Sequence, residues 1–131
     1  MAPTQDGTST LVAVSNAMVR LHKEQFGRGP TNARAHFAGA DILVCMLQDV
    51  LLPVERRLVE LGDQGRVRDS RVAFQAATAS DLISAVEQIV HRKVVAFASG
   101  IDPDANVVFE CFYFEPRASA SDGNGDGTLA A

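Results

Sequence analysis

Two short stretches of this chain are apolar at nearly every position, and they restrict the fold more than any other feature. Residues 42–47 read ILVCML, and residues 107–114 read VVFECFYF with Glu110 as the one charged side chain. Successive side chains of a strand point to opposite faces of its sheet, so strands of this composition need apolar surroundings on both faces. We therefore expect two strands that are central in a sheet or covered on both sides.

Each apolar stretch has a neighbour along the chain that is typical of a hairpin partner. Residues 32–38 alternate, with Ala33, Ala35 and Phe37 on one face, which indicates a half-buried strand; Gly39-Ala40-Asp41 then makes a tight turn. The β-prone residues 93–99 lead through Asp102-Pro103-Asp104-Ala105 into the second apolar stretch. The sequence therefore predicts two β-hairpins.

Stretches with helical periodicity precede the first hairpin and separate the two hairpins. Residues 10–26 carry apolar side chains at helical spacing and end at Gly27, which suits a left-handed cap. Pro53 suits a helix start, and Gly62-Asp63-Gln64-Gly65 interrupts or bends that helix before residues 66–91. One rod over residues 53–91 would be about 58 Å long, so one helix and two helices both remain open. The side chains expected to point inward are Val54, Leu58, Leu61, Val67, Phe74, Leu82, Val86 and Ile89.

These elements define the fold class, which is α+β in the order α-β-β-α-α-β-β. Helices on one face of a four-stranded antiparallel sheet are the natural arrangement. One layer of helices leaves the other face of the two apolar strands uncovered, and such a face usually marks an interface, so we expect a homodimer. We expect one domain over residues 10–116, a flexible N-terminus over residues 1–9 and a disordered acidic tail over residues 117–131.

Composition indicates the cellular compartment of the protein and the kinds of partner that it disfavours. The 131 residues carry a formal net charge of -4, which disfavours nucleic acid and anionic lipid as partners. No apolar run approaches the ~20 residues of a membrane-spanning helix, and residues 1–10 lack the layout of a signal peptide, so we expect a cytoplasmic protein without membrane insertion. Cys45 and Cys111 are expected to be buried thiols and not a disulfide.

No group of residues indicates catalysis or a bound metal. His22, His36 and His91 fall on three different elements without the spacing of metal ligands, and no serine or cysteine has the surroundings of a nucleophile. We therefore expect no metal, no cofactor and no enzyme activity.

Two features are candidates for binding a ligand or a partner. In Gly27-Arg28-Gly29-Pro30, backbone N–H groups near Gly29 and the guanidinium of Arg28 suit an anion, with Arg34 and His36 on the strand that follows; the alternative is a simple turn. Arg71 falls on the apolar stripe of its helix, which predicts a buried anchor paired with a carboxylate such as Glu55, Glu87 or Glu110. In the alternative, the stem of Arg71 packs on the core and its charge reaches water.

The second glycine pair suggests a different class of protein. Helix, Gly62-Asp63-Gln64-Gly65, helix resembles the GxxG loop of KH-type RNA-binding domains, in which Arg66 and Arg68 would assist. Such a loop usually carries a basic residue between its glycines, whereas this loop carries Asp63. Nucleic-acid binding therefore stays the alternative to a dimeric binding or regulatory module.

Segments spread along the chain, in their order and spacing, resemble one family. They are Gly27-Arg28-Gly29-Pro30, Asp41-Ile42-Leu43-Val44, Leu52-Pro53-Val54-Glu55-Arg56, Arg71 with Phe74, Val86-Glu87 and Lys93-Val94-Val95-Ala96-Phe97. Over residues 11–116 the chain is similar to the small bacterial MpsC domain, named after a sodium-translocating, membrane-potential-generating system. The resemblance implies a cytoplasmic protein that docks on a membrane-protein partner of an ion-translocation or inorganic-carbon uptake system. Leu52 stands where the family typically has Thr, and His91 stands where it usually has Gly, so both helix ends depart from its pattern.

Overall fold

The computed structural model describes residues 7–117, and its elements follow the predicted order α-β-β-α-α-β-β. The helices are α1 (Gly7–Phe26), α2 (Pro53–Glu60) and α3 (Gln64–Val90). The strands are β1 (Asn32–Phe37), β2 (Ile42–Gln48), β3 (Val94–Asp102) and β4 (Val107–Phe114). Residues 7–9, which we expected to be flexible, form the first turn of α1. The expected acidic tail lies outside the described residues, apart from residue 117.

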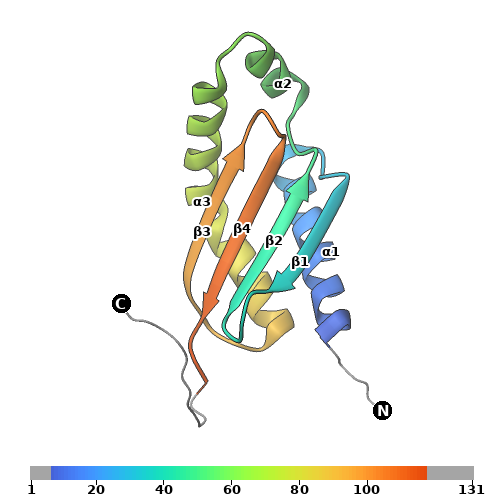
Figure 1. The fold of residues 1–131 in the computed structure, drawn as a ribbon, viewed down its shortest axis with the longest axis vertical. Helices are drawn as coiled ribbons and strands as arrows, with labels where there is room; N and C mark the ends of the chain where they lie inside the picture. The colour runs from blue at the N-terminus through green and yellow to red at the C-terminus, as the bar shows by residue number, and fades with distance from the viewer. Residues whose placement is uncertain (1–6, 118–131) are drawn as a thin grey trace.

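The four strands form one antiparallel sheet in the order β1-β2-β4-β3 (Figure 1). Two hairpins, β1–β2 and β3–β4, meet where β2 pairs with β4, and this register places Cys45 opposite Glu110. The two strands that are apolar on both faces are therefore the central ones, as the sequence predicts. Because each has a strand on either side, their backbone groups are paired within the sheet.

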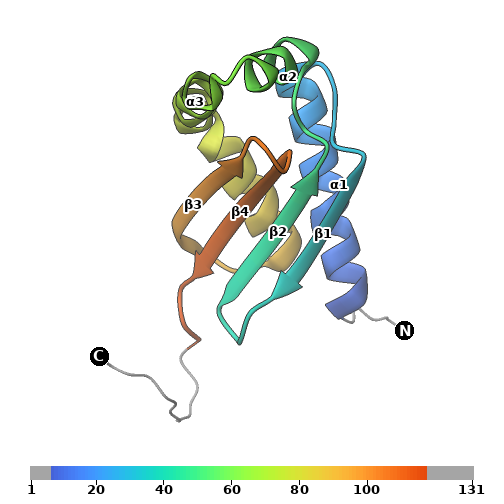
Figure 2. The same cartoon turned by 45° about the horizontal axis from the view of Figure 1, so that its top comes forward.

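The helices α1 and α3 cover one face of this sheet (Figures 1 and 2). α1 packs mainly on β1, and α3 packs mainly on β3 and against α1. Every second residue of the central strands points into this layer. The buried apolar core consists of Val14, Met18, Leu21, Ala35, Leu43, Cys45, Leu47, Val50, Leu51, Val67, Leu82, Val86, Val94, Val108, Phe112 and Phe114.

No described element covers the other face of the sheet (Figure 2). Phe109 is 43% exposed on this face, and Ile42 and Tyr113 are exposed to a similar extent. The strand registers bring these residues together with half-buried Met46 and Cys111. The expectation of an uncovered apolar face is confirmed. We call it the open face, formed by Ile42, Val44, Met46, Ala96, Ala98, Phe109, Cys111 and Tyr113.

Two residues with positive φ decide where the long helical stretch begins and ends. Gly62 has φ +82°, which ends α2 and makes two helices in place of one rod. His91 takes the left-handed cap of α3 with φ 62°, and its N–H donates to the carbonyl of Glu87 at 2.9 Å. A histidine therefore adopts a conformation that glycine enters most readily.

The predicted inward face of α2 is wrong for Val54 and Leu61, whereas Leu58 packs partly buried against the core. Val54 is 65% exposed and Leu61 is 64% exposed, while Leu58 is only partly buried. The buried residue of α2 is Glu55, which faces α3 because Arg71 pairs with it there. Phe74 of α3 was also expected inward and is 38% exposed. α2 and the neighbouring part of α3 therefore present apolar side chains outward.

Candidate functional site at the α2 end

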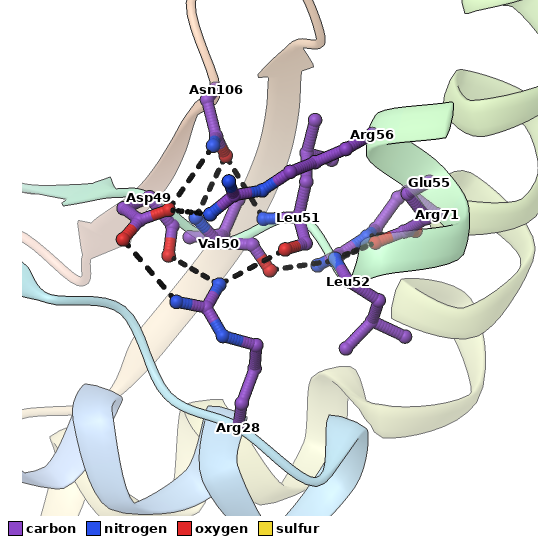
Figure 3. A network of polar contacts seen from close by, with 9 residues as sticks. All are labelled: Arg28, Asp49, Val50, Leu51, Leu52, Glu55, Arg56, Arg71 and Asn106. Carbon is purple, nitrogen blue, oxygen red and sulfur yellow. Dashed lines mark hydrogen bonds and ion pairs between the residues drawn. The ribbon is translucent and has the colours of Figure 1, made fainter. Parts of the chain in front are cut away.

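The connection between β2 and α2, residues 49–52, is where distant parts of the chain meet (Figure 3). Arg28 reaches it from the loop after α1, Asn106 from the turn between β3 and β4, and Arg71 from α3. Each of the three side chains bonds backbone groups of this connection. We call these residues, together with Asp49, Glu55 and Arg56, the polar junction.

Arg28 holds the start of the connection. Its Nη1 donates to the carbonyl oxygens of Asp49 at 2.8 Å and Leu51 at 3.0 Å, and its Nη2 lies 3.3 Å from Asp49 Oδ2. The second glycine of the same loop serves close packing, since a Cβ on Gly29 would lie 3.1 Å from the carbonyl oxygen of Val19 in α1. The predicted anion-binding loop thus directs its arginine to carbonyls and a carboxylate of its own chain.

Asp49 and Asn106 face each other in an unusual backbone conformation. Their φ angles are 61° and 59°, a region that residues other than glycine enter at a cost, though least for Asp and Asn. Asp49 N–H donates to the carbonyl of Asn106 at 2.9 Å, and Asn106 Oδ1 accepts from the N–H groups of Val50 and Leu51 at 2.8 and 2.9 Å. These bonds hold the β3–β4 turn against the start of α2.

Two arginines determine the charge of Asp49. Its carboxylate accepts from Arg56 Nη2 at 2.7 Å and lies against Arg28. Desolvation alone would raise the pKa of Asp49, but the hydrogen bond and charge of Arg28 and the charge of Arg56 outweigh it and lower the pKa. The Asp49 carboxylate therefore stays ionised, and its contacts with Arg28 and Arg56 link the loop after α1 to α2.

Arg71 and Glu55 form the buried part of the junction. Arg71 is 2% exposed; its Nε donates to Glu55 Oε2 at 2.8 Å and its Nη2 to Glu55 Oε1 at 2.5 Å. Nη2 also donates to the Val50 carbonyl at 3.1 Å, and the guanidinium lies 4.0 Å from the centre of the Phe26 ring. The predicted buried anchor is confirmed. Of the three carboxylates considered, Glu55 is the partner.

Glu55 also replaces a missing helix cap. Leu52 has no hydroxyl to offer at the start of α2, and Glu55 Oε1 accepts from the Leu52 N–H at 2.8 Å instead. Burial tends to raise the pKa of Glu55, but the hydrogen bonds from Arg71 and Leu52 and the charge of Arg71 lower it overall. Glu55, held by its ion pair with Arg71, therefore caps the start of α2, where Leu52 offers no side-chain acceptor.

The remaining predicted binding residues are not brought to this junction. Arg34 and His36 lie along β1, beside the N-terminal half of α1, where Leu11 and Ser15 border the same hollow. Arg28 follows the C-terminal end of α1, so the structure separates it from both.

The Gly62–Gly65 loop is arranged around its acidic residue. Asp63 Oδ1 accepts from the Arg66 N–H at the start of α3, and Asp63 Oδ2 lies 2.9 Å from Arg66 Nε. Gly65 already belongs to α3, and Arg68 is exposed. A carboxylate thus occupies the helix N-terminus where a phosphate would bind. Nucleic-acid binding stays a prediction that no feature of this loop favours.

Beside the junction lies an apolar groove between the C-terminal end of α1, α2 and α3. Its volume is about 410 Å³, and Arg71 with Glu55 forms part of its lining. We call it the α2 groove. It is lined by Gln25, Phe26, Leu52, Val54, Glu55, Leu58, Ser70, Arg71 and Phe74.

Sequence reasoning missed a second buried pair, between α1 and β4. Glu110 is fully buried, and its Oε2 lies 3.2 Å from Nε2 of buried His22, whose Nδ1 is 2.9 Å from the Met18 carbonyl oxygen. A single charge within an apolar strand was the available signal.

Burial and the Glu110 carboxylate raise the pKa of the Cys45 thiol to about 12, and the same two causes raise the pKa of the Cys111 thiol.

Two negative findings concern the part of the chain that the structure describes. Within residues 7–117, no cluster of three or more His, Cys, Asp or Glu side chains is arranged to hold a metal ion. None of the helices in this part has the length and hydropathy needed to span a membrane.

Comparison with known proteins gives one match. No curated protein and no solved structure matches the chain. The family described as "Na+-translocating membrane potential-generating system (MpsC)" matches residues 9–116, which include every strand, α2, α3 and nearly all of α1. This span covers most of the chain and agrees with the resemblance found in the sequence. The chain therefore belongs to the MpsC family.

Proposed function

We propose that this protein is a non-enzymatic binding module that acts as a dimer and docks on a membrane ion-translocation system from the cytoplasm. The observation that carries the proposal is the open face. Three large apolar side chains, Ile42, Phe109 and Tyr113, are each about two-fifths exposed on it. Contiguous apolar surface of this kind usually marks a site of protein association.

The surface shape of the open face suits a second copy of the same chain. Phe109 and Met46 stand side by side on the central strands, whereas Ala96 and Ala98 of β3 form part of a hollow beside them, together with Cys111. In a two-fold dimer Phe109 and Met46 of each subunit would meet the hollow of the partner, so one surface serves both subunits. Such a pairing stacks two sheets about 10 Å apart with the helices outside.

A binding role is also supported by the chemistry of the polar junction and by the family. The guanidinium groups of Arg28 and Arg71 bond groups of their own chain, so the junction shapes the molecule and presents no free nucleophile or acid–base pair. Membership of the MpsC family suggests a role associated with a Na+-translocating membrane-potential system. The protein would then contribute contacts to that system and not the translocation itself.

Sedimentation equilibrium at micromolar concentration tests the dimer. The wild-type chain should sediment at twice its 14.0 kDa mass, and Phe109→Asp should sediment as a monomer, because it places a charge within the apolar surface of the open face. Val12→Asp changes a residue of similar exposure in the helical layer and should remain dimeric. A monomeric wild-type chain would refute the proposal, as would Phe109→Asp that still sediments as a dimer.

A further inference from the structure

α2 and its C-terminal cap residue carry an apolar stripe that the fold leaves largely exposed, although Leu58 also packs against the core. Val54, Leu58 and Leu61 are spaced by four and three residues, so they lie within about 60° of one another around the helix axis. Val54 and Leu61 are mostly exposed, and the stripe borders the α2 groove. Spacing of this kind is the pattern of a helix that packs along another helix.

α3 provides the opposite wall of the groove with the same spacing. Ser70 and Phe74 line the groove, and exposed Ala77 continues their row one turn further. The ring of Phe74 contacts the ring of Phe26 edge-on, with ring centres 4.8 Å apart, so the C-terminal end of α1 supports this wall of the groove. The two rows share the same helical spacing, and the row on α3 is apolar apart from Ser70, so together they offer a binding surface for a third helix.

The charges around the groove indicate the chemistry of that helix. Arg71 within the groove is neutralised by Glu55, so the groove itself offers no net charge. Each row has an exposed arginine on the side that faces away from the buried ion pair. Arg57 lies one helical turn before Leu61, and Arg66 lies one turn before Ser70. These arginines pair with exposed carboxylates, Arg57 with Glu60 and Arg66 with Asp63. Exposed pairs of this kind are weak, so an incoming carboxylate can compete for the arginines.

We propose that the α2 groove binds an amphipathic helix of a partner protein, with apolar side chains at i, i+3 or i+4, and i+7 and acidic residues on both flanks. The inference rests on the proposed function in one respect, that the protein acts by docking. It does not rest on the dimer. α2 lies beyond the end of the sheet (Figure 2), and the groove is lined by residues of α1, α2 and α3 and of the connection before α2, with none from the strands, so dimerisation through the open face leaves it accessible.

Two designed peptides test the proposal with the full chain. Both are about 18 residues long, enough to hold a helix, with leucines at the three apolar positions. One carries Glu on both flanks and the other carries Lys at the same positions. The Glu peptide should bind at least about tenfold more tightly in fluorescence anisotropy, a difference of 1.4 kcal/mol. Amide NMR shifts should change for residues 52–61 and 70–77.

Variants separate apolar contact from charge. Val54→Ser should weaken binding of the Glu peptide, while Val12→Ser, at a residue of comparable exposure on α1, should leave it unchanged. Arg57→Glu combined with Arg66→Glu should reverse the preference between the two peptides. Unfolding midpoints of the variants should match that of the parent, because all of these side chains are exposed.

Several outcomes would overturn the groove assignment. They are equal affinity for the two peptides, shifts confined to the open face, and no binding of either peptide at millimolar concentration. Binding to phosphatidylserine vesicles that the double arginine variant loses, without peptide binding, would replace the partner helix with a lipid surface. The mass from sedimentation decides the dimer independently, so failure of the groove and failure of the proposed function are distinguishable.

Discussion

Replacing Arg71 with Met removes the charge of the buried pair and keeps the length of the side chain. The variant loses two hydrogen bonds to Glu55, one to the Val50 carbonyl and the stacking on Phe26. Met is apolar and flexible enough to fill most of the vacated volume, so a cavity contributes little. The cost therefore comes mainly from the groups that Arg71 leaves without a partner.

The magnitude follows from the burial of those groups. Removing one partner of a buried ion pair costs about 3–5 kcal/mol, because the other charge stays behind without compensation. The Glu55 side chain is 10% exposed and keeps its bond from the Leu52 N–H, which places the cost near the lower end, about 3 kcal/mol. For a domain of this size, such a loss lowers the melting temperature by roughly 10–20 °C.

Urea unfolding followed by circular dichroism measures this difference. The variant should show a lower midpoint with an unchanged slope, at the same protein concentration as the parent. Adding Glu55→Gln to Arg71→Met removes the stranded charge, so the double variant should be more stable than Arg71→Met alone. An Arg71→Met protein within about 1 kcal/mol of the parent would refute the reasoning, since it would mean that the pair contributes no more than an exposed one.

Two further predictions concern the same end of the molecule. Gly62→Ala should destabilise the protein by about 1–2 kcal/mol, because φ at Gly62 is +82°. Gly65→Ala should stabilise it by about 0.5–1 kcal/mol, because no atom lies within 4 Å of the new Cβ and alanine favours a helix more than glycine does. Urea midpoints in the opposite order would contradict the backbone conformation of Gly62 and Gly65. Because the folded pKa of Glu55 is lowered, its ionised form stabilises the protein above the unfolded pKa near 4.3, and this contribution is lost as pH falls through the folded value. The stability difference between Glu55→Gln and the parent should therefore be full at pH 7 and decrease as pH falls below the unfolded pKa, and a difference that does not change across this acidic range would assign the effect to something other than charge.

The sheet could be predicted from the sequence because its signals are local. Strands that are apolar on both faces must be central, and turn residues such as Gly39 and Asp102 lie where the hairpins reverse. The uncovered face follows from the same reasoning, since only one helical layer was available. The break between α2 and α3 stayed open because Gly62 permits both a bend and a stop, and only its positive φ decides between them.

The site was predictable only in part because its contacts span long distances in sequence. Arg71 could be identified from its place on an apolar stripe, and Glu55 was among its candidate partners. Asn106 could not, since its contacts with residues 49–51 require the β3–β4 turn to meet the start of α2. Arg28 was predicted to bind an anion or a partner, whereas in the structure it bonds backbone carbonyls and Asp49 of its own chain, a contact across 21 residues that no local pattern indicates.

The wrong prediction for α2 has a physical meaning. Turning α2 by about 100° around its axis would bury Val54 and release Glu55, since adjacent residues of a helix are separated by that angle. Burying Val54 and Leu61 would stabilise the fold by about 1.5–3 kcal/mol each, whereas a buried ion pair is often no better than apolar packing. The structure nevertheless buries Glu55 with Arg71 and exposes the stripe. Departures from local rules concentrate where function requires them. The orientation of α2 therefore supports the proposal that its exposed apolar side chains bind a partner.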